Sequence, residues 1–194
     1  MKRLLIMLMA LLLAALPGLA EETDRQTEAN AAYASVLLNG EAWTPSGDVR
    51  EDWNPVRFTV LDLDGDGVSE VILEVTEPEA FIILNGINSV IATEWPYRGL
   101  LNLKDDGTFT FSSGAMDNGV AMLVYQGDFG AQWGYLPLAE SVSDADGTVT
   151  YWLDGGAEQT DEAGYLAFLA EQDAKLDALW YDYTEENVRM LLGQ

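Results

Sequence analysis

The chain has 194 residues with no cysteine and no histidine, and 33 Asp and Glu against nine Lys and Arg give a formal net charge of −24. The missing residue types exclude disulfides, thiol nucleophiles, histidine general bases and the usual Cys/His zinc sites. The negative charge disfavours nucleic acid and anionic membranes as partners, because like charges repel.

The N-terminus has the pattern of a secretory signal peptide. Lys2 and Arg3 precede the apolar run LLIMLMALLLAAL, and small residues follow before Glu21. The run is short for a transmembrane helix, so a retained membrane anchor is the weaker alternative. We therefore predict a signal peptide over residues 1–20, cleavage near Ala20, and a secreted domain over residues 21–194 without membrane association. The mature length suits a single domain.

Apolar residues at helical spacing predict a first helix over Glu28–Leu38, which Asn39-Gly40 would end. Residues 41–55 contain two prolines and indicate a loop that leads into the first strand.

An acidic loop, DLDGDGVSE, lies between two β-type runs that predict strands over residues 56–61 and 69–75. Its acids fall at alternating positions, so a tight turn can direct their side chains to one point. Carboxylates gathered in this way repel one another unless a cation lies among them, and hard oxygen ligands in this number suit Ca²⁺. The predicted ligands are the side chains of Asp62, Asp64, Asp66 and Glu70 and the carbonyl oxygen of Val68.

The loop differs from an EF-hand in two respects. Its twelfth position is Leu73, where an EF-hand has a bidentate Glu, and strands rather than helices flank it. Gly65 and Gly67 would let the backbone take positive φ and curve around an ion. The alternative is an acidic hairpin turn without metal, because Asp-Gly pairs alone mark turns.

The middle of the chain alternates short β-type runs with turn signals, which predicts an antiparallel, meandering sheet. The predicted strands are Phe81–Leu84, Val90–Thr93, Leu100–Leu103, Thr108–Phe111, Val120–Tyr125, Tyr135–Leu138 and Thr148–Leu153.

Helical patterns return at the C-terminus. Thr160 is the predicted N-cap of a helix with acids in its first turn, and Thr184 is the predicted N-cap of a shorter one. The first would carry an apolar stripe that packs on the sheet. An N-terminal helix, a sheet and C-terminal helices place the chain in the α+β class. The stripe consists of Tyr165, Phe168, Leu169, Leu176, Leu179 and Trp180.

The segment VLDLDGDGVSEVILEV resembles the calcium loop of FG-GAP and VCBS-type repeats. In those families the first, third, fifth and ninth loop residues ligate calcium, so the resemblance implies the same ligands here. Those families repeat the motif across several blades, whereas this chain has it once. The single copy argues against a propeller.

Residues 26–192 as a whole resemble small secreted proteins of Gram-positive, clostridia-like bacteria that carry one such loop. The resemblance continues in YRGLLNLKDDGTFTFSSGAMDNG and in the C-terminal WYDYTEEN. It implies an extracellular location and a metal, and it implies no activity.

We therefore expect a non-catalytic extracellular module for binding or adhesion, with a glycan or protein ligand and no catalytic residues. The alternative is a carboxylate-dependent glycoside hydrolase, which needs neither His nor Cys. Trp133, in a Gly-rich stretch, is the best candidate for an exposed sugar-stacking ring, although every Trp could instead be core. Arg98 is interpreted as an internal salt-bridge partner rather than an anion receptor.

Overall fold

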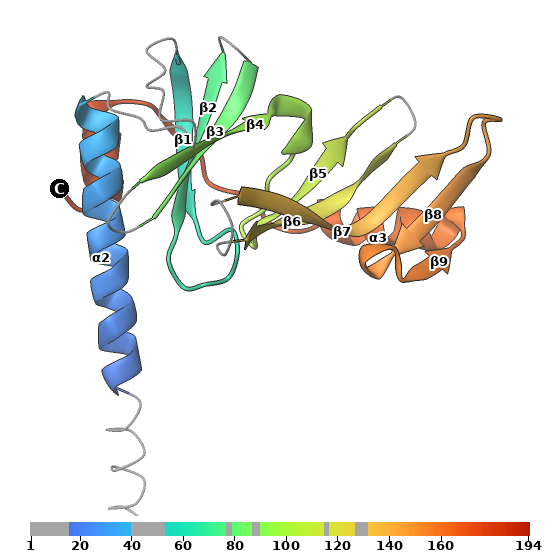
Figure 1. Cartoon of the computed structure of the whole chain (residues 1–194), viewed down its shortest axis with the longest axis horizontal. Helices are drawn as coiled ribbons and strands as arrows, with labels where there is room; N and C mark the ends of the chain where they lie inside the picture. The colour runs from blue at the N-terminus through green and yellow to red at the C-terminus, as the bar shows by residue number, and fades with distance from the viewer. Residues whose placement is uncertain (1–15, 40–52, 77–78, 87–89, 115–116, 127–131) are drawn as a thin grey trace, which may run out of the picture.

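The computed structural model describes residues 16–39, 53–76, 79–86, 90–114, 117–126 and 132–194, with the side chains of 16–23 excepted. Its strands form two antiparallel five-stranded sheets that follow one another along the long axis of the molecule (Figure 1). The α+β class and the antiparallel meander are confirmed, but the meander is divided between two sheets instead of forming one.

The first sheet has the strand order β10-β1-β2-β3-β4, in which each of β1 to β4 pairs with its neighbour in the chain. The C-terminal strand β10 returns to pair with β1 through Phe58 and Tyr181. Its strands are β1 (Pro55–Leu61), β2 (Glu70–Thr76), β3 (Glu79–Asn85), β4 (Ile91–Pro96) and β10 (Tyr181–Asp182).

The second sheet has the strand order β5-β6-β7-β8-β9, and a short 3-10 turn, η1 (Tyr97–Gly99), leads from β4 toward it. Its strands are β5 (Thr108–Ser112), β6 (Asn118–Gln126), β7 (Gln132–Ser143), β8 (Val149–Leu153) and β9 (Glu158–Thr160).

Three α-helices lie within the described part of the chain: α2 (Leu16–Asn39), α3 (Glu162–Asp173) and α4 (Glu185–Leu191). Helix α2 lies beside the first sheet with α4 against it, and α3 lies along β7 and β8 of the second sheet (Figure 1). None of these described helices combines the length and the apolar character that crossing a bilayer requires.

The two sides of the first sheet are buried against different partners. Val71, Leu73 and Val75 of β2 share a core with α2 and α4, whereas Ile72 belongs to a core shared with the second sheet. Successive residues of a strand point to opposite faces, so β2 is buried on both sides. A third cluster packs Tyr165 of α3 on the far face of the second sheet.

The helices differ from the sequence prediction at their ends. Helix α2 starts well before the predicted Glu28. Helix α3 is capped by Asp161, whose side chain accepts a hydrogen bond from the Gly164 N–H, so the prediction of Thr160 is wrong. Thr184 does cap α4, by accepting from the Asn187 N–H.

The predicted stripe of α3 is also too long. Leu176 and Leu179 lie beyond the end of the helix and are 73% and 67% exposed. The chain leaves the helix there because it pairs with the segment before β5: the Leu176 carbonyl accepts from Asp105 N–H, and the Ala178 N–H donates to Leu103.

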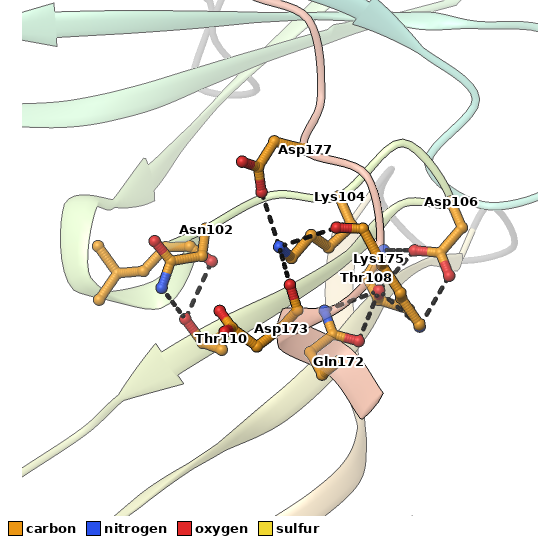
Figure 2. A network of polar contacts seen from close by, with 10 residues as sticks. Asn102, Lys104, Asp106, Thr108, Thr110, Gln172, Asp173, Lys175 and Asp177 are labelled. Atoms are coloured by element: carbon orange, nitrogen blue, oxygen red, sulfur yellow. Dashed lines mark hydrogen bonds and ion pairs between the residues drawn. The ribbon is translucent and has the colours of Figure 1, made fainter. Parts of the chain in front are cut away.

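A buried lysine fastens this C-terminal segment to the second sheet (Figure 2). Lys104 Nζ donates to the carbonyls of Asp173 and Lys175, at 3.4 and 3.3 Å, and to Asp177 Oδ1 at 2.7 Å. The Asp173 carbonyl belongs to the last residue of α3 and the Lys175 carbonyl follows the helix end, where backbone acceptors lack helical partners and a cation is favourable. The lysine therefore holds the segment that runs on to β10.

Replacing Lys104 with Met should lower the free energy of unfolding by about 3 kcal/mol, because hydrogen bonds from a buried charged donor are lost. Asp177→Asn is the matched control and should cost less than about 1 kcal/mol, since the Asp177 side chain is 78% exposed. Urea denaturation of both variants measures the difference. Equal losses would show that the ion pair, and not the carbonyl contacts, carries the stability.

Candidate metal centre

The acidic loop closes the hairpin between β1 and β2. Leu61 and Glu70 are its last paired residues, so the predicted strand ends are correct to within a residue. Gly65 and Gly67 have φ of 76° and 85°. Only glycine adopts such values without strain, and the two glycines allow the chain to turn back twice within the loop.

Three of the four predicted acids come together. Oxygens of Asp62, Asp64 and Glu70 all lie within 4.8 Å of one another. Two oxygens that share one Ca²⁺ at bond lengths of about 2.3–2.6 Å cannot be more than about 5 Å apart. The three carboxylates meet this upper limit, so they could hold one metal ion.

Backbone hydrogen bonds hold the carboxylates in place. Asp62 accepts from the N–H groups of Gly65 and Gly67, at 2.8 and 3.1 Å, and Asp64 accepts from Asp66 N–H at 3.2 Å. Glu70 Oε2 accepts from Leu63 N–H at 2.9 Å. A carboxylate has about four lone-pair directions, so one or two such bonds leave capacity for a cation.

Glu70 is the buried member of the cluster, at 4% exposure. Burial raises the pKa of Glu70 to about 8, and the charges of Asp64, Asp62 and Asp66 push it in the same direction. Burial, followed by the charge of Asp66, also raises the pKa of Asp64. These carboxyls are short of positive charge, which a divalent ion would supply.

Asp66 lies outside the three-residue group. Its Oδ2 forms an ion pair with Arg25 Nη2 of α2 at 2.8 Å, and its Oδ1 accepts from Val68 N–H. The adjacent Gln26 Oε1 accepts from Ser69 N–H at 2.7 Å. Helix α2 thus contacts the loop at Asp66 and Ser69.

The Val68 side chain is buried in the core that the first sheet shares with α2. The carbonyl of Val68 as a metal ligand stays a prediction.

The other candidate residues are placed differently from their expected roles. Trp133 is 4% exposed and packs on Tyr125, with ring centroids 5.1 Å apart, so of the two alternatives the core position is correct for this residue and the exposed ring is wrong. The tryptophan belongs to the core between the sheets.

Arg98 is exposed and donates to Ser112 Oγ, and no salt bridge joins it to an acid among the described residues. The predicted internal salt bridge of Arg98 is therefore not found there.

At this site the sequence analysis missed the contact of α2 with the loop. Arg25 and Gln26 fall in a segment too polar to indicate a helix, and their partners lie about 40 residues away. No local pattern marks such a pair.

We compared the chain with protein-family models, with curated proteins and with solved structures. None of the three comparisons found a match.

Glu70→Gln should remove a pH-dependent instability of the metal-free protein. A carboxyl whose pKa is raised in the folded state destabilises the fold as pH rises from its unfolded-state value toward about 8. In excess chelator, the parent should therefore lose stability between about pH 5 and pH 8 relative to the variant. Thermal unfolding across this range measures the gap.

Glu79→Gln, at the exposed first residue of β3, is the matched control because it removes one acid without touching the loop. It should leave the pH profile of the parent unchanged. If the melting temperature of Glu70→Gln varies with pH in parallel with that of the parent, Glu70 does not have a raised pKa in the folded state.

Proposed function

We propose that this protein is a secreted, non-catalytic binding module whose β1–β2 loop holds one structural Ca²⁺. The observation that supports a metal site is that carboxylate oxygens of Asp62, Asp64 and Glu70 lie within 4.8 Å of one another, with Glu70 buried. The signal-peptide pattern of residues 1–20 supports the extracellular location, where free calcium is plentiful enough for a structural site.

The ion would act on the fold through the loop. It neutralises the mutual repulsion of the three carboxylates and fixes the register of β1 against β2. Because Arg25 and Gln26 of α2 contact the same loop, ordering the loop also orders the surface on which the helix docks. An ion that binds only the folded state raises stability by mass action, by about 2.7 kcal/mol at a hundredfold excess over its dissociation constant.

We assign the calcium ligands from the positions of the oxygen atoms in the loop. Asp62, Asp64 and Glu70 supply side-chain oxygens, and the loop pattern adds the Val68 carbonyl. Asp66 lies outside the three-residue group and is paired with Arg25, so we propose it as a ligand that joins only when its side chain turns toward the ion. Water completes the six to eight oxygens that Ca²⁺ prefers.

Two cavities in the described part of the chain bear on the glycoside hydrolase alternative. Each has a single acid in its lining, Glu94 in one and Asp177 in the other. Glycoside hydrolysis uses two carboxyl groups that face each other across the substrate. Neither lining supplies that pair, and we therefore retain the binding role.

Asp64→Ala should abolish the calcium response. For the parent, free calcium at a hundredfold excess over its dissociation constant should raise the melting temperature by roughly 5–10 °C, which corresponds to about 2.7 kcal/mol in a domain of this size. The variant should melt at the same temperature with calcium and with EDTA. Differential scanning calorimetry measures both.

Asp105→Ala removes one exposed acid from a different turn and is the control for the loss of charge. It should keep the full calcium response. Equal stabilisation of Asp64→Ala and the parent by calcium would refute the site, since a diffuse attraction of calcium to an acidic surface would not depend on one residue.

A further inference from the structure

A cavity of about 510 Å³ lies where the two sheets meet, apart from the acidic loop. Its lining residues come from β4 and η1, which follow one another in the chain, and from β5 and β7 of the second sheet, with Ser113 just after β5. The volume falls within the roughly 300–1,000 Å³ of small-molecule sites. The four aromatic rings in its lining are those of Trp95, Phe111, Trp133 and Tyr135.

These rings are held in place by specific contacts. Trp95 Nε1 donates to the Gly99 carbonyl at 2.9 Å, and a Cβ on residue 99 would lie 2.9 Å from the same nitrogen. Glycine at this position therefore allows the indole to approach its acceptor. The rings of Phe111 and Tyr135 pair at 5.3 Å across the sheet. The apolar wall is preformed, and a flat apolar molecule would suit it.

Arg98 is the cation of this cavity. One of its N–H groups donates to Ser112 Oγ at 2.8 Å, and Ser112 Oγ in turn donates to the Gly114 carbonyl at 3.0 Å. A guanidinium has five N–H donors, so most of its donors are left for an acceptor in the cavity. The serine fixes the orientation of the arginine and leaves its charge unneutralised.

The lack of an acidic partner sets Arg98 apart. Among the six Lys and Arg side chains that the structure describes, it alone has no ion pair. Acids outnumber cations more than threefold in this chain, so chance would readily supply a partner. The five paired cations are Arg25, Arg57, Lys104, Lys175 and Arg189.

The one acid in the lining, Glu94, is directed away from the aromatic wall. Glu94 pairs with Ile82, which faces the α2 core, whereas its neighbour Trp95 pairs with Phe81, which faces the core between the sheets. Neighbouring strand residues point to opposite faces, so Glu94 and Trp95 diverge. Of the two charged side chains in the lining, Arg98 rather than Glu94 therefore lies on the side of the aromatic rings.

We propose that this cavity binds a small organic anion, with a flat apolar body between the aromatic rings and a carboxylate on Arg98. The inference gives the proposed binding role a site and a class of ligand, and it does not depend on the calcium loop. An uncharged saccharide, the other class that aromatic rings commonly bind, would not need the unpaired arginine.

A pair of probes separates these two classes. 1-Naphthylacetate carries the flat body and the charge, and 1-naphthylacetamide carries the same body without the charge. Calorimetric titration of the purified protein in calcium should show the acetate binding about tenfold more tightly than the amide, because only the acetate can form a charge-assisted hydrogen bond with the guanidinium.

Arg98→Gln should weaken the acetate about tenfold or more and leave the amide unchanged. Tyr135→Ala, which removes an exposed part of the wall, should weaken both probes alike. Arg189→Gln is the control, since it removes an equal charge from α4, outside the cavity, and should change neither affinity.

Three results would overturn the proposal: no heat of binding with 1-naphthylacetate at millimolar concentration, equal affinity of parent and Arg98→Gln for it, or binding of a soluble cello-oligosaccharide that Arg98→Gln does not alter. Each variant is also melted with and without calcium. A parent that binds naphthylacetate but gains no stability from calcium would refute the metal proposal alone, and the reverse result would refute the pocket alone.

Discussion

Glu70 places a carboxyl in the interior of an acidic protein, beside Asp62 and Asp64, and this burial constrains the loop that joins β1 to β2. Taking a carboxylate out of water is costly unless a proton or a cation compensates it. The loop cannot simply open, because its ends are paired strands and α2 contacts its outer half through Arg25 and Gln26. A bound cation would relieve the cost without moving any of these elements.

The second sheet depends on a different contact. The chain leaves α3, is held by Lys104, and then returns to the first sheet as β10. This return joins the two ends of the molecule, because α3 packs on one sheet and β10 pairs with the other. The cavity with Arg98 lies at the junction that this path closes, so its shape depends on the relative position of the sheets. The metal loop and the cavity are therefore separate features of one scaffold.

The separation matters for function. Calcium is proposed to stabilise the fold, and the cavity is proposed to recognise a ligand. Many binding proteins keep these tasks apart, because a rigid scaffold preorganises its binding residues and reduces the entropy lost on association. The exposed arginine and the buried carboxyl also illustrate one electrostatic rule. Among the described residues, Arg98 is a cation without an ion pair and Glu70 is a buried acid without one, so each is a place where a partner of opposite charge would be favourable.

The sequence by itself determined the hairpin and its loop, the meandering order of the strands and the cap of α4 at Thr184, because these depend on neighbours within about ten residues. It also brought Asp62, Asp64 and Glu70 together, since turn geometry is local. Only the tertiary structure decided the rest. It divided the strands into two sheets, buried Trp133, ended α3 at Asp173, paired Asp66 with Arg25 and placed no acid of the described ranges in an ion pair with Arg98. Each of these outcomes depends on residues far apart in the chain, whose packing no local pattern of polarity or spacing encodes.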